Sequence, residues 1–123
     1  MKILVVDDEI DVKDLFLQKF RKEIKRGEVN FSFAHSGEDA LKFLTEHESE
    51  AVLILSDINM PGMTGIELLR NIRNHYHKPP PVVMMITAYG DEENKKQAKD
   101  LGADDFLTKP LDFAVLKVRL NKE

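Results

Sequence analysis

The chain has 123 residues, with 18 Lys and Arg against 22 Asp and Glu, a formal net charge of −4, and no Cys. This length predicts a single domain spanning residues 1–123, and the mild negative charge argues against direct nucleic-acid binding, which needs a basic surface. The lack of Cys excludes disulfides, thiolate zinc sites and cysteine nucleophiles.

No stretch is apolar enough to cross a membrane. The longest apolar runs, at 51–55 and 82–86, have five residues each, whereas a spanning helix needs about 20. A signal peptide is also excluded, because Asp7, Asp8 and Glu9 interrupt the first apolar run. We therefore expect a soluble, cytoplasmic protein without a membrane partner.

Five short aliphatic runs predict β-strands, at residues 3–6, 31–34, 52–55, 82–86 and 105–107. The first, third and fourth runs are continuously apolar, which is typical of parallel strands buried on both faces. The second run alternates and the fifth is short, so we expect these two strands at the edges of a sheet.

Five helices are predicted after these strands. The first runs from Asp11 to Lys25, with apolar residues at four-residue spacing, and Gly27 ends it. The other four are predicted to begin at Ser36 or Gly37, Thr64, Asp91 and Pro110. Capping residues support these starts, since Glu67 completes a capping box with Thr64, and Asp91 caps the helix that Gly102 ends. We interpret residues 75–81, which read HYHKPPP, as an exposed loop.

Alternating strands and helices predict an α/β fold, a doubly wound five-stranded parallel sheet with helices on both faces. Functional residues of such folds gather at the carboxyl ends of the strands. Here the first strand is followed by Asp7 and Asp8, the third by Asp57, the fourth by Thr87 and the fifth by Lys109. One such Asp is commonly a turn former or helix cap, but the whole set predicts a polar site at one edge of the sheet.

Three carboxylates repel one another, so a site of this kind needs a cation. Lys109 offsets one charge, and oxygen ligands without His or Cys suit Mg²⁺ or Mn²⁺. The acidic run Asp7, Asp8, Glu9 excludes a flavin or dinucleotide site, which needs a loop that attracts phosphate. His35 and His47 lack the partners of a nucleophile motif, so a His-based triad is unsupported.

The chain resembles the receiver domains of two-component response regulators nearly from end to end. Four stretches carry the resemblance: ILVVDDE at 3–9, DINMPGMTG at 57–65, TA at 87–88 and FLTKP at 106–110. The resemblance implies a flavodoxin-like (βα)5 fold with the strand order 2-1-3-4-5.

The resemblance also implies roles for the site residues. Asp57 would be the phosphoacceptor, which receives a phosphoryl group from a sensor histidine kinase or a phosphotransfer protein. The metal ligands would be the carboxylates of Asp7, Asp8 and Asp57 with the backbone carbonyl of Asn59. Lys109 would pair with the phosphoryl oxygens, and the hydroxyl of Thr87 would bond one of them.

A switch is implied as well. Thr87 would move toward the phosphoryl group, and Phe106 would turn inward into the space that it leaves. This would change the surface formed by the fourth helix, the fifth strand and the fifth helix, which would control an output domain, a partner or a homodimer. The peptide bond between Lys109 and Pro110 is a cis candidate, and Tyr89 either shields the phosphoryl group or is a surface aromatic.

Two other functions stay open. A magnesium-dependent phosphatase or phosphotransferase with an aspartyl nucleophile usually has a second acid two residues later, where this chain has Asn59. An interaction module that works without phosphorylation would have a defective site, whereas all five polar positions are filled here. We therefore expect a phosphoacceptor that promotes only its own phosphorylation and dephosphorylation, not an enzyme that turns over a separate substrate.

Overall fold

The five predicted strands form one parallel sheet. The computed structural model describes residues 1–47, 52–75 and 81–122. Its strands are β1 (Lys2–Val6), β2 (Asn30–Ala34), β3 (Val52–Asp57), β4 (Val82–Thr87) and β5 (Asp105–Thr108). They follow the order β2-β1-β3-β4-β5, and every neighbouring pair is parallel. The predicted fold and the edge positions of the second and fifth strands are thus confirmed.

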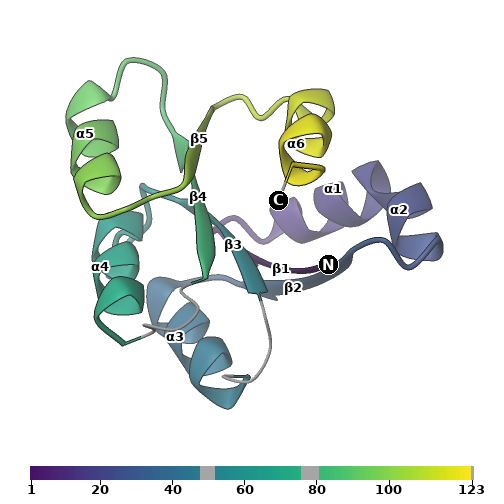
Figure 1. Ribbon diagram of the computed structural model, residues 1–123, viewed down its shortest axis with the longest axis horizontal. Helices are drawn as coiled ribbons and strands as arrows, with labels where there is room; N and C mark the ends of the chain where they lie inside the picture. The colour runs from purple at the N-terminus through teal and green to yellow at the C-terminus, as the bar shows by residue number, and fades with distance from the viewer. Residues whose placement is uncertain (48–51, 76–80, 123) are drawn as a thin grey trace.

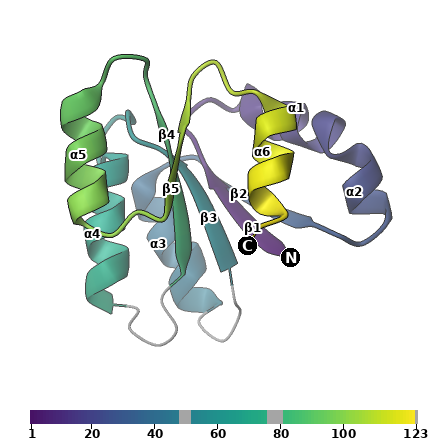
Figure 2. The ribbon, with the colours of Figure 1, turned by 45° about the horizontal axis from the view of Figure 1, so that its top comes forward.

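Helices cover both faces of the sheet, as Figures 1 and 2 show. One face carries α1 (Asp11–Lys19), α2 (Arg21–Lys25) and α6 (Phe113–Leu120), and the other carries α3 (Gly37–Glu46), α4 (Gly65–His75) and α5 (Glu92–Asp100). None of the helices in the described residues is long and apolar enough to span a membrane. His75 is the last residue of α4, and the rest of the predicted loop, residues 76–80, lies outside the described residues.

The two faces have different cores. Under α1 and α6, five aromatic rings contact one another, mostly edge to face, and we call them the ring cluster: Phe16, Phe20, Phe31, Phe33 and Phe113. Under α3 and α4 the buried core is aliphatic, with Leu4, Ile54 and Ile72 all fully buried. The sheet is therefore buried on both faces, as its continuously apolar strands predict.

The first helix differs from its prediction in one respect. The range Asp11 to Lys25 is divided at Phe20 into α1 and α2, because Phe20 has φ −105° and ψ 18°. Its N–H still donates to the carbonyl of Phe16 at 3.0 Å, and its own carbonyl accepts from Ile24 at 2.9 Å. Phe20 is only 1% exposed and stacks on Phe16, so the bend occurs where the chain adjusts to bury this ring.

The last helix begins three residues later than predicted. Pro110 does not open it, and α6 starts at Phe113, where the carboxylate of Asp112 accepts hydrogen bonds from the N–H groups of Ala114 and Val115. An aspartate cap satisfies two helix donors that Pro110 could not satisfy. The peptide bond between Lys109 and Pro110 is cis.

The predicted caps have mixed outcomes. Thr64 and Glu67 form the predicted capping box, with Thr64 Oγ1 accepting from the N–H of Glu67. Ser36 caps α3 by accepting from the N–H of Asp39 at 3.0 Å. Asp91 is the residue before α5, but its side chain accepts no capping hydrogen bond from the helix backbone; its Oδ2 accepts from the side-chain amide of Asn94.

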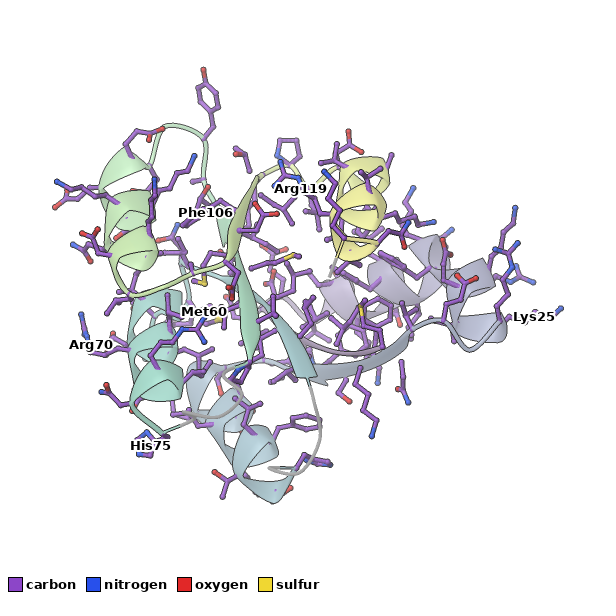
Figure 3. The ribbon with its side chains drawn as sticks, viewed as in Figure 1. Lys25, Met60, Arg70, His75, Phe106 and Arg119 are labelled. Atoms are coloured by element: carbon purple, nitrogen blue, oxygen red, sulfur yellow. The ribbon has the colours of Figure 1, made fainter. Side chains whose placement is uncertain are left out.

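Two arginines donate hydrogen bonds to the segments around β4 and β5. Arg73 of α4 donates to the carbonyls of Pro81 and Gly102 and to the carboxylate of Asp104. The neighbouring α5 buries only Ala98 among its residues. Arg119 reaches from α6 to β5 (Figure 3), where its Nη1 donates to the carboxylate of Asp105 and to the carbonyl of Phe106. These contacts join α4 and α6 to the β4–β5 edge of the sheet.

Candidate functional site

Polar side chains gather at the carboxyl edge of the sheet. Asp7 directly follows β1, Asp57 ends β3, Thr87 ends β4 and Lys109 directly follows β5. Because all five strands are parallel, these positions share one edge. The structure brings the three predicted carboxylates together with the predicted ammonium.

The acidic cluster consists of Asp7, Asp8 and Asp57. One carboxylate oxygen from each of the three lies within 4.8 Å of the others. Asp7 is 6% exposed and Asp57 is 2% exposed, while Asp8 is exposed. Asp7 and Asp57 are thus buried against the sheet, whereas Asp8 connects the cluster with solvent.

Both carboxylate oxygens of Asp57 accept hydrogen bonds. Oδ1 accepts from the backbone N–H of Asn59 at 3.1 Å, and Oδ2 accepts from Nζ of Lys109 at 2.5 Å. The first bond belongs to the turn that leaves β3, and the second crosses from the chain after β5. Asp57 is therefore oriented by two elements far apart in the sequence.

The surroundings of Asp7 disfavour the ionised form of its carboxyl group. Burial raises its pKa above the ordinary value of 3.8, and the nearby charge of Asp57 raises it further. The hydrogen bond that Oδ1 accepts from the N–H of Glu9, at 2.9 Å, and the charge of Lys109 lower the pKa but do not outweigh burial. An ionised Asp7 therefore favours a nearby cation.

Lys109 is the cation that the chain itself supplies. Burial lowers its pKa, but the hydrogen bond to Asp57 and the charges of Asp57, Asp7 and Glu9 outweigh burial, so the pKa is raised above 10.5. Lys109 is thus protonated at neutral pH. If all three carboxylates are ionised, the site carries a charge of −3 + 1 = −2.

The donor set fits a hard divalent cation. Three carboxylates converge without a His or Cys among them, and one of the three faces solvent, where a metal such as Mg²⁺ would keep part of its water shell. A charge of +2 would also balance the net charge of the site. The acidic cluster could therefore bind the divalent metal that the sequence predicts.

Gly65 allows α4 to begin close to the phosphoacceptor candidate. Its N–H donates to the carbonyl of Ile58 at 2.8 Å, and a Cβ at Gly65 would overlap the carbonyl oxygen of Asp57 and the Cα of Ile58. Both obstacles are backbone atoms, which side-chain motion cannot relieve. Gly65, the last residue of the DINMPGMTG stretch, thus permits a close approach between the backbones of α4 and of the segment after β3.

The two candidate switch residues lie at the β4–β5 edge. Thr87 is 3% exposed, and its hydroxyl makes a long contact, 3.5 Å, with the carbonyl of Leu107. Phe106 is half-buried on the α5 side of β5 (Figure 3), and the ammonium of Lys95 lies 5.6 Å from its ring centroid. Tyr89 is 91% exposed, which agrees with a surface aromatic in this conformation.

One residue at the site has a contact that sequence reasoning missed. Nδ1 of His35, between β2 and α3, lies 3.1 Å from the backbone carbonyl oxygen of Asp7. The sequence offers no sign of this contact, because the partner is a main-chain atom and not a side chain. From the sequence, the only role that we assessed for His35 was membership of a His-based catalytic triad.

Solved structures similar to this chain include receiver domains of response regulators. A response regulator receiver protein from Pseudomonas putida is 27% identical, with a TM-score of 0.85, 99% of this chain covered and 96% of that chain. A probable two-component system response regulator with a GGDEF domain is also 27% identical, with a TM-score of 0.85, covering 99% of this chain and 48% of that chain.

A third structure shows the same fold at lower identity. It is the receiver domain of the Saccharomyces cerevisiae response regulator Ssk1, crystallised with the histidine phosphotransfer signaling protein Ypd1, at 23% identity and a TM-score of 0.84, covering 99% of this chain and 87% of that chain. The family "Response regulator receiver domain" matches residues 3–121. Together with the acidic cluster at the carboxyl edge of the sheet, this match shows that the chain belongs to the response regulator receiver domain family.

Proposed function

We propose that residues 1–123 form one receiver domain that acts as a phosphorylation-dependent switch, with Asp57 as the phosphoacceptor. The observation that carries this proposal is the position of Asp57. Its carboxylate is buried at the strand end, receives a hydrogen bond from Lys109, and lies within 4.8 Å of the carboxylates of Asp7 and Asp8. A nucleophile, a fixed cation and an oxygen-rich metal site thus meet at one point.

The reaction is the transfer of a phosphoryl group from a phosphohistidine. A carboxylate oxygen of Asp57 attacks phosphorus, the bond between phosphorus and the imidazole nitrogen breaks, and its electron pair stays on that nitrogen. The product is an acyl phosphate on Asp57. The protein contributes to this step mainly by positioning and by charge stabilisation.

Each neighbour of Asp57 has a part in that step. The N–H of Asn59 fixes one carboxylate oxygen, and Lys109, already beside the other oxygen, pairs with the phosphoryl oxygens as they arrive. Asp7, Asp8, Asp57 and the carbonyl of Asn59 would hold a divalent metal, which would supply positive charge for the approaching phosphoryl group. Thr87 donates its hydroxyl to a phosphoryl oxygen after leaving its long contact with Leu107.

The switch would act on the surface formed by α5, β5 and α6. Phosphorylation adds negative charge and strong acceptors beside Thr87, and the inward movement of Phe106 would break its contact with Lys95. Phe106 has no hydroxyl, so its movement can report to a partner only by burial. Structures with and without beryllofluoride test this step, and a Phe106 ring that stays in place would contradict it.

The relatives suggest the partners. The Ssk1 receiver domain is crystallised with the phosphotransfer protein Ypd1, and the response regulator with a GGDEF domain carries its receiver in a longer chain. We infer that this chain takes its phosphoryl group from a sensor histidine kinase or phosphotransfer protein. Its α5–β5–α6 surface would then control an output domain, a separate partner or a homodimer.

One experiment separates this function from its alternatives. The chain is incubated with Mg²⁺ and acetyl phosphate, and the intact protein is weighed by mass spectrometry. We expect one added phosphate in the wild type, its loss in Asp57→Ala, and its retention in Asp100→Asn, which changes an exposed aspartate at the end of α5.

The other results identify the other functions. Release of many phosphates per chain would favour an enzyme with an aspartyl nucleophile. No adduct with any donor would favour an interaction module that works without phosphorylation. An adduct that persists in Asp57→Ala would place the phosphoacceptor elsewhere.

A further inference from the structure

The backbone of Asp7 is bonded to the end of β2 at two points. Its N–H donates to the carbonyl of Ala34 at 3.0 Å, and its carbonyl oxygen lies 3.1 Å from Nδ1 of His35. The regular pairing of β1 with β2 stops at Val6 and Ala34. Beyond that point, the ring of His35 supplies the next contact where a backbone N–H would otherwise donate.

The contact defines which ring nitrogen of His35 carries hydrogen. A backbone carbonyl can only accept a hydrogen bond, so Nδ1 must be the donor. A neutral His35 must therefore be the Nδ1–H tautomer, and its Nε2 has no hydrogen. This requirement follows from geometry alone and does not depend on a bound metal.

Fixing the carbonyl of Asp7 also fixes the start of Asp8. The two residues share one planar peptide group, so the direction of the Asp7 carbonyl sets the direction of the Asp8 N–H and the position of its Cα. Within the described part of the chain, the exposed carboxylate of Asp8 has no hydrogen bond or salt bridge that could orient it. Its direction in the acidic cluster therefore depends on the backbone.

The other side of the turn is fixed as well. Oδ1 of Asp7 accepts from the N–H of Glu9 at 2.9 Å, which closes a short turn around Asp8. The ring of His35 and the carbonyl of Ala34 hold this turn against β2. Asp8 is thus carried by a segment whose backbone is bonded both before and after it.

We propose that His35 is a positioning residue for the metal site. It touches neither a metal nor a phosphoryl group, and it acts by orienting the Asp7–Asp8 peptide through the hydrogen bond from Nδ1. This inference rests on the proposed function, because it concerns the metal that phosphorylation requires. Outer contacts of this kind typically change metal affinity by about 10- to 100-fold when they are removed.

The main test compares two substitutions at the same position. His35→Ala removes the donor, whereas His35→Asn places an amide N–H as many bonds from Cα as Nδ1 is. Binding of Mg²⁺ alone is measured by titration calorimetry. We expect the affinity to fall about 10-fold in His35→Ala and to stay within about threefold of the wild type in His35→Asn.

A purely structural role for His35 predicts a different result. It would lower the free energy of unfolding, measured without metal, in His35→Ala and leave the Mg²⁺ affinity of the folded protein unchanged. Equal Mg²⁺ affinities in all three proteins would overturn the proposal. An affinity as low in His35→Asn as in His35→Ala would also overturn it, because the lost donor would then not be the cause.

A second measurement uses the wild type without metal. The ¹⁵N chemical shifts of the His35 ring, recorded at alkaline pH, distinguish the two neutral tautomers. We expect hydrogen on Nδ1, and hydrogen on Nε2 would overturn the proposal even if every variant failed to fold. Failure of the proposed function is a separate result, since it appears as a wild type that gains no phosphate on Asp57 while its Mg²⁺ affinity still differs from that of His35→Ala.

Discussion

The ring cluster and the acidic cluster are both groups of like residues that the fold brings together, but their interaction energies have opposite signs. The five rings of the ring cluster come from α1, the junction between α1 and α2, β2 and the start of α6, and Phe16 contacts the other four. Each contact removes apolar surface from water, and most of them place ring edges against ring faces, which stabilises the fold.

The acidic cluster is also drawn from distant elements, yet its contacts are repulsive. Burial and the charge of Asp57 both raise the pKa of Asp7, so the ionised form is disfavoured in the folded chain. Lys109 compensates one charge and leaves two. The helix-covered faces of the sheet therefore stabilise this protein, whereas its carboxyl edge lowers stability by gathering carboxylates that could bind a divalent cation.

The largest expected effect breaks the ring cluster. Phe16→Ala removes a ring that is 1% exposed, and we expect the free energy of unfolding to fall by about 3–5 kcal/mol. Urea denaturation followed by circular dichroism measures this change. Leu17→Ala, on the same helix but 38% exposed, is the control and should cost less than about 1 kcal/mol. A similar loss in both variants would show that the ring cluster is not the main source of stability on this face.

The second largest effect is expected at Gly65, where α4 begins against the end of β3. Gly65→Ala would place a Cβ against the backbone of Asp57 and Ile58, so we expect a loss of about 1–3 kcal/mol together with slower phosphorylation of Asp57. Gly37→Ala is a matched control, because Gly37 also begins a helix but the three atoms nearest to its added Cβ all belong to the side chain of Met63. Met63 can move, so the control should lose less stability and keep its phosphorylation rate.

A third substitution should stabilise the protein. Asp7→Asn removes a buried charge beside Asp57, and we expect the free energy of unfolding without metal to rise by about 1 kcal/mol, the value for two like charges about 4 Å apart in water. With Mg²⁺ added, the wild type should gain stability and the variant should not.

The pH dependence of this difference has a defined sign. The folded state binds a proton on Asp7 more tightly than the unfolded chain does, because the folded pKa is raised above 3.8. The stability cost of Asp7 should therefore be absent below pH 3.8, appear as the pH rises toward the folded pKa, and be complete above it. An Asp7→Asn variant less stable than the wild type at neutral pH, without metal, would refute the repulsion argument.

The smallest effect concerns a salt bridge beside the ring cluster. Nζ of Lys117 lies 3.0 Å from Glu23 and 5.1 Å from the ring centroid of Phe20, and its hydrogen bond is the main reason that the pKa of Glu23 is lowered. Because Lys117 is partly exposed, we expect Glu23→Gln to lose only about 0.5 kcal/mol at neutral pH. This stability is present above pH 4.5 and is lost as the pH falls through the lowered folded pKa.

The exposed pair Arg26 and Glu28, 3.8 Å apart, gives the control for that measurement. Because both side chains are exposed, Glu28→Gln should change the free energy of unfolding at neutral pH by less than about 0.5 kcal/mol. If Glu23→Gln loses no more stability at neutral pH than Glu28→Gln does, the contact with Lys117 contributes nothing to stability.

The sequence predicted the features that depend on repeated patterns. Continuous apolar strands determine that both faces are covered, and the strand order followed from the family resemblance. The acidic cluster was predictable because strand ends of a parallel sheet share one edge. By contrast, the division of the first helix at Phe20 and the start of α6 at Phe113 depend on local packing and capping, which periodicity does not encode.

The supporting contacts of the site could not be predicted for a related reason. Residues such as His35 and Gly65 act through backbone atoms of Asp7 and Asp57, and no pairing of side-chain types reveals such contacts. The cation–π contact of Lys95 with Phe106 depends on the position of α5 relative to β5. That position is a property of the folded chain and not of any single motif.

The contact of Arg119 with β5 affects how this protein meets other sheets. β5 is an edge strand, and an edge strand offers unpaired backbone groups to which a foreign strand can add. The guanidinium of Arg119 donates to the carbonyl of Phe106 and to the side chain of Asp105, so it occupies one of those groups and places charge beside the strand. The same arginine that fastens α6 to the sheet therefore also protects this edge against aggregation by strand addition.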